Sequence, residues 1–314
     1  MASVVTITFS PCIDKNIFVP RLIQEKKMRC TFPIVEPGGG GINVARGIHR
    51  LGGHVTAIYL ASGYHGQLLN ELLRKEEVDI APIEIDGNTR ESWTILEKST
   101  NKQFRFLMPG PEINESAWLT CISKLELVPD IQYIVISGSV PDTIPKNFVE
   151  IIGAIAKEKN AKLIVDLSGE SLLHAVKFGV YMIKPNLNEL ASLIVALGLT
   201  QKSMIAAAQE IIAMGKCEIV VVSIGAGGAV LVNKDVILEI KPPPVTVRST
   251  VGAGDSMVAG IVQSLVEKRT LREALQYGVV CGTAATMNQG TALFDLDDVE
   301  NLYALMQNDF LKNI

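Results

Sequence analysis

Short β-branched runs alternate with amphipathic segments along much of this chain, and this alternation constrains its fold more than any other feature. Residues 55–61 have the composition of a buried strand, 66–75 the periodicity of a helix, and 81–85 the composition of another strand. A strand–helix–strand order favours parallel pairing with right-handed crossovers. We therefore expect an α/β fold, with further strands at 4–9, 133–137, 163–167, 181–184 and 219–224, and with helices at 148–159, 172–178, 256–268, 271–287 and 297–306.

The bulk composition excludes several classes of function. At 314 residues, with 48% hydrophobic and 20% charged residues, the chain is typical of a globular protein with a large core. A net charge of −4 gives no electrostatic reason to bind nucleic acid or an anionic membrane. The five cysteines form no C-x-x-C pair, which favours reduced thiols in a cytoplasmic protein. The first residues lack a signal-peptide pattern, and the apolar stretch 278–287 is too short to span a bilayer.

The alternation of strands and helices is interrupted by a pattern typical of a β-hairpin. Residues 91–97 and 103–108 form its expected arms, and 99–102 its turn. Trp93 on one arm and Phe106 on the other are expected to share an apolar face. An apolar face on a small sheet needs a cover, because a bare one promotes aggregation.

We expect residues 13–35 and 86–108 to pair as a small lid sheet whose outer face packs against a second subunit, giving a homodimer. These segments carry clustered cations. Such a cluster is usually a solvated face, but here the charges alternate with strand-like residues and could bind a phosphorylated ligand. The cationic residues concerned are Lys26, Lys27, Arg29, Arg90 and Arg105.

A glycine-rich loop runs directly into the helix expected from residue 256. Its sequence is Thr250-Val251-Gly252-Ala253-Gly254-Asp255, so little side-chain bulk covers the amides ahead of the carboxylate. The first amides of a helix lack intrahelical partners and carry partial positive charge, which suits a phosphate that gains charge during transfer. Asp255 is either a base or metal ligand at this anion site or a plain helix cap, and both interpretations stay open here.

Four consecutive glycines, residues 38–41, precede another helical segment. A turn needs one or two glycines, so four suggest a backbone that lies against something bulky, such as a sugar. Asn43 then opens the helix, either as its cap or as a ligand for sugar hydroxyls. Asp14 follows the first strand, and it is either a turn residue or a ligand contact beyond the carboxyl end of that strand.

Two further patterns concern a nucleotide. Asn186 and Glu189 lie three residues apart at an expected helix start, which fits a capping box and also fits a pair that orients Mg²⁺ on nucleotide phosphates. The run Gly225-Ala226-Gly227-Gly228 precedes another strand, 229–233, so we interpret it as a hairpin and not as a dinucleotide fingerprint. Its backbone is a candidate wall of a nucleotide pocket.

Together these motifs resemble those of the ribokinase-like, or PfkB, carbohydrate kinases. Residues 38–45 are similar to the first family signature, 249–257 to the second, and Lys184-Pro185-Asn186 with Glu189 to the Mg²⁺ motif. The resemblance implies a single domain over residues 1–314, built as a three-layer αβα sandwich with a mostly parallel central sheet and a small β-sheet lid. It also implies ATP as co-substrate, with Mg²⁺ and K⁺ as cofactors.

Segments 36–46, 105–110, 136–139 and 242–257 are most similar to the family branch that phosphorylates fructose 6-phosphate in glycolysis. The implied reaction transfers a phosphoryl group from ATP to the 1-hydroxyl and yields fructose 1,6-bisphosphate, and the branch also implies a tetramer with ATP. Tagatose-6-phosphate kinases and 1-phosphofructokinases share the motifs and remain alternatives. A non-catalytic sugar-phosphate sensor on the same scaffold is an alternative of another class.

The resemblance also implies a role for each matching residue. Asp255 is the expected base, and the amides of Gly252, Ala253 and Gly254 are expected to contact the transferring phosphoryl group. The expected sugar-phosphate ligands, some reaching across a dimer, are Asp14, Lys27, Arg29, Gly39, Gly40, Asn43, Arg90, Arg105 and Ser139. The expected ATP ligands are Lys184, Asn186, Ser223, Gly225, Gly228 and Thr250. Mg²⁺ is expected at Asn186 and Glu189, and K⁺ near Ser249, Val251, Ala285, Asn288 and Gly290.

Two positions depart from the pattern of the branch. Ala292 stands where an arginine is expected, beside the K⁺ loop, and Lys26 stands where a glycine is expected. The first change bears on the details of the K⁺ site. The Lys26 change affects the expected binding of the substrate phosphate or the expected inhibition by ATP.

Overall fold

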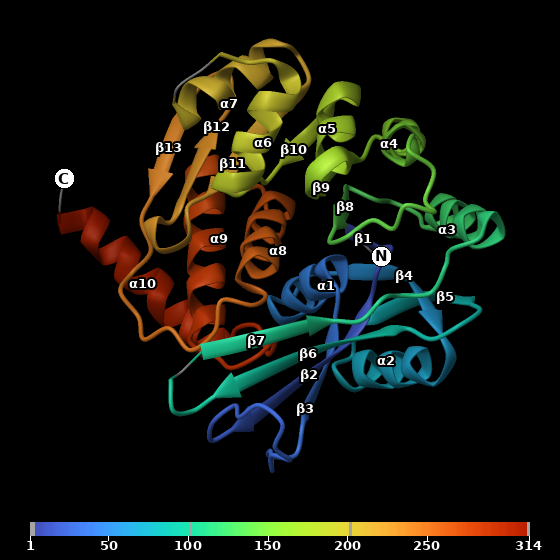
Figure 1. The fold of residues 1–314 in the computed structure, drawn as a ribbon. Helices are drawn as coiled ribbons and strands as arrows, with labels where there is room; N and C mark the ends of the chain where they lie inside the picture. The colour runs from blue at the N-terminus through green and yellow to red at the C-terminus, as the bar shows by residue number, and fades with distance from the viewer. Residues whose placement is uncertain (1–3, 101, 201–202, 313–314) are drawn as a thin grey trace.

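The computed structural model describes residues 4–100, 102–200 and 203–312, and it contains a large and a small sheet (Figure 1). Within these residues the large sheet has the order β13-β12-β11-β10-β9-β8-β1-β4-β5. Its pairings are parallel except those of β12 with β11 and β13. The strands are β1 (Val4–Thr8), β4 (Val55–Ser62), β5 (Asp79–Ile85), β8 (Tyr133–Ser137), β9 (Lys162–Asp166), β10 (Val180–Ile183), β11 (Cys217–Ser223), β12 (Ala229–Val232) and β13 (Ile237–Ile240).

Helices cover both faces of the large sheet, which confirms the expected three-layer α/β fold. One face packs against α3 (Glu115–Leu127), α4 (Phe148–Glu158), α5 (Gly169–Phe178), α6 (Leu187–Leu197) and α7 (Met204–Ala213). The other packs against α1 (Gly40–Arg50), α2 (Gly63–Lys75), α8 (Ala253–Val266) and α9 (Leu271–Thr286). The last helix, α10 (Leu296–Lys312), packs against α9.

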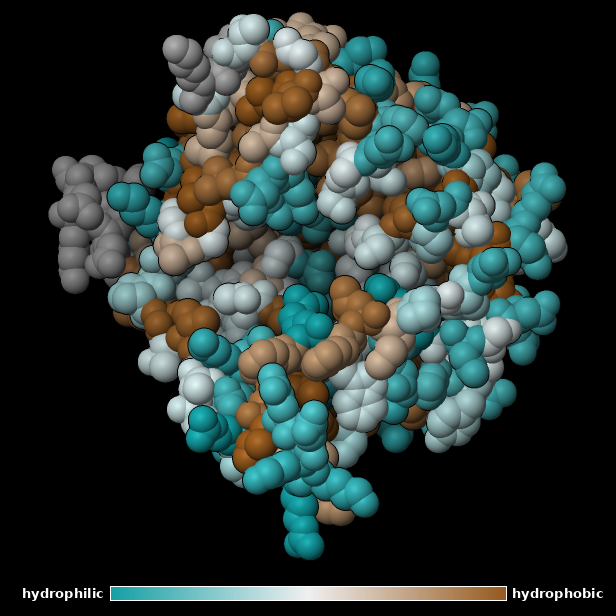
Figure 2. All heavy atoms as spheres, in the orientation of Figure 1, coloured by the Kyte–Doolittle hydropathy of each residue, from teal (hydrophilic) through white to brown (hydrophobic). Residues whose placement is uncertain are grey.

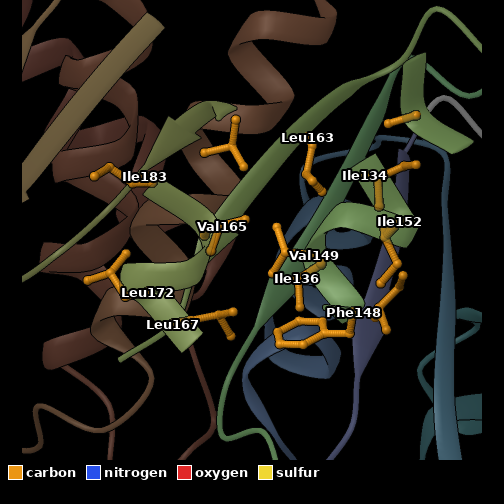
Figure 3. Packing of buried hydrophobic residues seen from close by; sticks show 14 of the residues in the cluster. Ile134, Ile136, Phe148, Val149, Ile152, Leu163, Val165, Leu167, Leu172 and Ile183 are labelled. Carbon is orange, nitrogen blue, oxygen red and sulfur yellow. The ribbon is translucent and has the colours of Figure 1, made fainter. Parts of the chain in front are cut away.

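The core follows the two-residue period of the strands. In β8, Ile134 and Ile136 face the α4 layer, whereas Val135 faces the α1 layer. Figure 3 shows Phe148 and Ile152 of α4 beside these isoleucines. Because both faces of the sheet are buried, its strands appear in the sequence as continuous apolar runs. No helix within the described residues is long and apolar enough to cross a bilayer.

The small sheet has the order β3-β2-β6-β7 and lies beyond the carboxyl end of β1 (Figure 1). Its strands are β2 (Cys12–Val19), β3 (Ile34–Gly38), β6 (Arg90–Glu97) and β7 (Lys102–Leu107). The β6–β7 hairpin pairs Trp93 with Phe106, and β2 pairs with β6 in parallel. The first segment extends to residue 38, beyond the expected limit of 35, and 20–33 form no strand. Asn101, in the expected hairpin turn, lies outside the described residues.

Two helices begin earlier than expected, and neither polar candidate is a cap. Helix α1 begins at Gly40 with Gly39 as its N-cap, so Asn43 lies inside the first turn. Helix α8 begins at Ala253 with Gly252 as its N-cap, so Asp255 is the third helical residue. Both cap glycines have positive φ, 115° and 77°, a conformation that side-chain-bearing residues rarely adopt. The glycines therefore turn the chain into each helix and leave the polar side chains to face each other.

Candidate active site

The side chains of Asn43 and Asp255 meet where the first turns of α1 and α8 approach each other. Asn43 Nδ2 donates to Asp255 Oδ2 at 2.9 Å, and the carboxylate is half-buried. Burial raises the pKa of Asp255 to about 7, and the nearby Asp166 carboxylate adds to the rise. The Asn43 hydrogen bond and the Lys184 charge oppose it. A carboxyl group with a pKa near neutrality is suited to accept a proton from a hydroxyl group.

The amino end of α8 presents backbone amides beside this carboxylate. The first bond of its helical ladder runs from Ser256 N to Gly252 O at 2.9 Å, so the amides of Gly254 and Asp255 precede the ladder. The Ala253 amide, in contrast, donates a long hydrogen bond of 3.4 Å to Thr250 O. These amides and the helix dipole make the end of α8 favourable for an anion.

A buried ion pair lies on the other side of Asp255. Lys184 Nζ and Asp166 Oδ1 are 3.0 Å apart, and Ser137 Oγ donates to the same carboxylate at 3.3 Å. Burial alone would lower the pKa of Lys184, but the Asp166 charge and hydrogen bond raise it, so the ammonium keeps its charge. A Cβ added at Gly254 would lie 3.5 Å from Lys184 Nζ, which puts this cation at the helix end. Sequence reasoning located Asp166 on a strand but gave it no role.

A cavity of about 760 Å³ lies beside the amino end of α8, where Ala253 and Gly254 line it. Five of the six expected ATP ligands line it, namely Asn186, Ser223, Gly225, Gly228 and Thr250. Ala226, Ala253 and Gly254, which were expected at the nucleotide pocket or the phosphoryl group, also line it. The rest of its wall, which sequence reasoning did not identify, consists of Pro242, Pro243, Pro244, Val245, Val247, Met257, Val279, Gly282, Thr283 and Thr286. The apolar wall resembles core packing in the sequence, so no local signal marks it as a pocket.

Asn186 and Glu189 form the capping box that their spacing predicts. Asn186 Oδ1 accepts from Glu189 N at 2.9 Å, and Glu189 Oε2 accepts from Asn186 N at 2.8 Å. The cap uses one oxygen of each side chain, and the second oxygen of the half-buried Glu189 carboxylate accepts no bond from this cap. Oxygen donors such as those of Asn186 and Glu189 are compatible with a hydrated Mg²⁺.

Three of the expected sugar-phosphate ligands, Asp14, Arg90 and Ser139, lie near the carboxyl ends of β1 and β8. Asp14 Oδ2 would lie 2.3 Å from a Cβ on Gly38, so this carboxylate contacts the glycine run. Arg90 Nη2 donates to Ser10 O at 3.2 Å. Ser139 and Ser10 line a neighbouring cavity of about 220 Å³. Figure 2 shows the hollow between the large-sheet layers and the small sheet near the centre of this face.

The pKa of the buried Asp14 carboxyl group is also affected by the charge of Arg105 on β7. Burial raises its pKa, and hydrogen bonds from Cys12, Thr291 and Ser92 oppose this rise, as does the charge of Arg105. Arg105 is itself exposed. Asp14 and Arg105 are therefore close enough for their charges to interact across the small sheet.

Packing within the chain requires glycine at two positions of the glycine run, Gly40 and Gly41. A Cβ on Gly40 would lie 2.5 Å from Ser137 Oγ and 2.6 Å from Gly138 N. One on Gly41 would lie 2.6 Å from Ile7 O. Such contacts are too short for any side chain, so α1 packs this closely on the strand ends only because both residues are glycine.

Lys27 and Arg29 lie apart from the other expected ligands. Both are exposed in the connection between β2 and β3. The register pairs Cys12 with Gly38 at the site end of these strands and Asn16 with Ile34 toward the other, so the connection lies at the distal end (Figure 1). The chain does not bring these two cations to its own Asp255.

The five expected K⁺ ligands lie on the loop before α8 and on the end of α9 with the residues that follow it, and Thr286 joins the two segments. The amides of Arg248 and Ser249 donate to Thr286 O at 2.7 and 3.2 Å, which brings the segment 249–251 beside the end of α9. The other three are Ala285, Asn288 and Gly290, and Gly290 packs against Asn16 and Glu36 of the small sheet. At Ala292, Arg50 donates to the backbone carbonyl.

Comparison with known proteins identifies the family. A protein-family model described as "pfkB family carbohydrate kinase" matches residues 4–298. The chain belongs to this family. The expected family and fold are both confirmed by this match and by solved structures.

This pfkB-family chain has close relatives of nearly equal length. It is 40% identical to ATP-dependent 6-phosphofructokinase isozyme 2 of Escherichia coli K12 over 308 aligned residues. The alignment covers 98% of this chain and 99% of the relative. A crystal structure of phosphofructokinase-2 from Escherichia coli in complex with substrates and products matches with a TM-score of 0.91 and 38% identity over 98% of this chain and 100% of that one. The same enzyme in complex with potassium matches with a TM-score of 0.90 and 39% identity over the same shares of the two chains.

Proposed function

We propose that this pfkB-family kinase transfers the γ-phosphoryl group of ATP to the 1-hydroxyl of fructose 6-phosphate, yielding fructose 1,6-bisphosphate. The observation that carries the proposal is the position of Asp255, whose carboxylate lies between the 760 Å³ cavity and the sugar-side residues. Its pKa of about 7 makes it a base at neutral pH. The identity to a 6-phosphofructokinase over 98% of the chain favours fructose 6-phosphate over the other ketohexose phosphates.

In this reaction Asp255 takes the proton of the attacking 1-hydroxyl. The amides of Gly252, Ala253 and Gly254 face the phosphoryl group and offset the negative charge that gathers on its oxygens. Lys184 adds a fixed positive charge beside them, held by Asp166 at 3.0 Å. Because the Lys184 ammonium and the Asp166 carboxylate are already paired before substrate binds, little reorganisation of these charges is needed during transfer.

ATP occupies the larger cavity, with its base against the apolar wall from α9 and its phosphates toward Gly254. Asn186 and Glu189 would hold a hydrated Mg²⁺, which when bound would supply positive charge to the nucleotide phosphates. Ser249, Val251, Ala285, Asn288 and Gly290, from the segment 249–251 and from the end of α9 and the residues after it, would hold K⁺. The potassium complex of the Escherichia coli enzyme favours this assignment.

The sugar phosphate lies on the other side of Asp255. Asp14, Gly39, Gly40, Asn43 and Ser139 bind its hydroxyl groups, and Arg90 and Arg105 bind its phosphate. Lys27 and Arg29 serve the site of a second protomer, since they are remote from their own. The protein is accordingly a homodimer through the small sheet, which closes over the substrate as a lid and excludes water, and it forms a tetramer with ATP.

A coupled ADP-release assay over fructose 6-phosphate, tagatose 6-phosphate and fructose 1-phosphate, with and without K⁺, tests the proposal. We expect the largest kcat/KM with fructose 6-phosphate. A larger value for either of the other sugars would reassign the substrate. Saturable sugar-phosphate binding without ADP release would identify a sensor and overturn the kinase assignment.

Mixing two variants tests the shared site. Lys27→Ala keeps its own Asp255, and Asp255→Asn keeps its own Lys27. If Lys27 serves the neighbouring protomer, unfolding and refolding the two variants together restores one complete site in each mixed dimer. Mixed samples no more active than the separate variants would place Lys27 outside the shared site.

A further inference from the structure

Arg46, one turn after Asn43 on α1, is a fully buried cation with no assigned role. Its side chain is 1% exposed, and its guanidinium reaches several elements at once. Nη1 donates to Asn43 Oδ1 at 3.2 Å, to Pro37 O at 3.0 Å and to Thr291 O at 3.1 Å. Nε and Nη2 donate to the Glu76 carboxylate at 2.8 to 3.1 Å. Every partner of this arginine is therefore an oxygen.

The contact with Asn43 decides which way the Asn43 amide points. A guanidinium carries only donors, so the Asn43 atom that faces it must be the carbonyl oxygen. The amide NH₂ then faces Asp255, to which it donates at 2.9 Å. The reversed amide would turn its NH₂ toward the guanidinium and its oxygen toward the carboxylate, and both contacts would be repulsive. Arg46 thus fixes the hydrogen bond that Asp255 receives.

Glu76 of the α2 C-cap keeps the buried charge in place. Burial alone would raise the pKa of Glu76, but hydrogen bonds and charge from Arg46, together with the charge of Arg50, bring it below its ordinary value. A buried cation without such a partner is costly in free energy. Here two nitrogens of the Arg46 guanidinium, Nε and Nη2, donate to the Glu76 carboxylate. Arg50 shares Glu76 at 3.1 Å and binds the carbonyls of Ala292 and Phe294, but its bonds do not include Asn43. The two arginines therefore share an anchor and differ in their contact with the site.

We propose that Arg46 is a positioning residue, which sets the basicity of Asp255 by locking the orientation of the Asn43 amide. The proposal rests on the proposed function, because it is read out through phosphoryl transfer. The Asn43 bond stabilises the ionised carboxylate and so lowers the pKa of Asp255 against the effect of burial. Loss of Arg46 frees the amide to reverse, and the acid limb of the pH–rate profile moves to higher pH.

A double-mutant cycle on the full-length protein tests this. The pH profile of kcat/KM is measured for wild type, Arg46→Gln, Asn43→Ala and the double variant. In the wild-type background we expect Arg46→Gln to lower kcat/KM at pH 7 by roughly tenfold and to raise the acid-limb pKa by about one unit. In the Asn43→Ala background the same change should leave that pKa unmoved, because Arg46 acts through the amide. Equal shifts in both backgrounds would mean that the arginine charge acts directly, and would overturn the proposal.

Two further variants keep the test decisive. Arg50→Gln is the matched control, and it should lower the melting temperature without moving the acid limb. If Arg46→Gln does not fold, the cycle is run with Arg46→Lys, which keeps the charge beside Glu76 but not the fork that reaches Asn43. An unmoved acid limb in Arg46→Lys would also overturn the proposal. A wild type that phosphorylates no sugar phosphate would refute the function instead, before any variant is compared.

Discussion

The Asn43 amide donates to the Asp255 carboxylate at 2.9 Å although the two residues are 212 positions apart in the sequence. This bond joins the first turns of α1 and α8, which pack against each other beneath the large sheet. The carboxylate therefore receives a donor from one helix while it belongs to another. Its orientation depends on how closely those helices pack, and Gly47 of α1 permits that approach, because a Cβ on it would lie 2.6 Å from the Ala259 Cβ of α8.

Replacing Asp255 by Asn should remove most of the activity without loss of fold. The amide has nearly the same shape but accepts no proton, so we expect kcat to fall roughly a hundred- to ten-thousand-fold. Steady-state assays measure the rate, and circular dichroism with a thermal melt checks the fold. A folded Asp255→Asn protein with wild-type turnover would rule out this residue as the base.

The pKa of about 7 also makes Asp255 a source of pH-dependent stability. Its folded pKa lies above the unfolded value near 3.8, so its stabilising effect is complete at low pH and is lost as pH rises toward 7. Between pH 5.5 and 8 the wild type should lose about 2 kcal/mol from this group, after which the carboxylate is charged in both states.

Asp255→Asn lacks this titration and serves as the reference. Urea unfolding at both pH values gives the difference in unfolding free energy between wild type and variant. We expect the variant to gain relative to the wild type as the pH rises. A difference that is constant with pH would show that the folded pKa of Asp255 is ordinary.

Two glycine-to-alanine changes should separate packing from chemistry. Gly40→Ala places a Cβ 2.6 Å from the Gly138 backbone nitrogen, so we expect a loss of about 1–3 kcal/mol in unfolding free energy. Gly254→Ala meets only Lys184 Nζ, at 3.5 Å, and should fold normally while its methyl group obstructs the phosphoryl site. Urea melts and kcat measurements on both variants distinguish the two effects. Normal kcat in Gly254→Ala would contradict a phosphate beside that residue.

Removing the cation of the Lys184–Asp166 pair should affect both stability and acid–base behaviour. Lys184→Met leaves the Asp166 carboxylate without its ion-pair partner, and we expect a loss of about 3 kcal/mol in unfolding free energy. Because the Lys184 charge opposes the raised pKa of Asp255, the acid limb should move to higher pH. The control is the double variant Lys184→Met/Asp166→Asn, which should recover part of the stability. Additive losses would mean that the two groups do not depend on each other.

An acidic substitution on β7 should dissociate the proposed dimer. Phe106 and Leu107 are 50% and 61% exposed in one protomer, and hydrophobic and hydrophilic side chains lie side by side over the small sheet (Figure 2). Phe106→Asp should therefore give a monomer by light scattering after gel filtration, because a charge is costly in a buried interface. Leu127→Asp, at an 81% exposed residue on α3, is the matched control and should keep the dimer. A dimeric Phe106→Asp protein would exclude this face as the interface.

The parallel core and both signature loops could be predicted because their signals are local. Strands buried on both faces appear as apolar runs, and the β6–β7 hairpin follows from alternation around a turn. Helix α3 was missed, although Asn114 caps it and Trp118, Cys121 and Leu125 form its buried stripe at helical spacing. The signal was present but interrupted by polar residues. Helix α7 is rich in alanine and was also not predicted.

The candidate site was only partly predictable because several of its contacts are made between distant residues. Nothing near Asp166 in the sequence indicates an ion pair with Lys184, since adjacent parallel strands bring them together. Two of the partners of Arg46, Glu76 and Thr291, come from the C-cap of α2 and the loop at residue 291. The cause of the glycine run was likewise hidden, because it lies in the strand ends that α1 contacts. Local patterns identify candidate residues, whereas these pairings depend on the completed fold.

The joining of α1 to α8 has a consequence during protein synthesis. Asn43 leaves the ribosome 212 residues before Asp255 does, so the elements proposed to hold the sugar emerge well ahead of the proposed base. A nascent chain that lacks α8 has neither the proposed base nor the helix end proposed to bind the phosphoryl group. The Asn43–Asp255 hydrogen bond therefore forms only after the chain has been synthesised at least as far as α8.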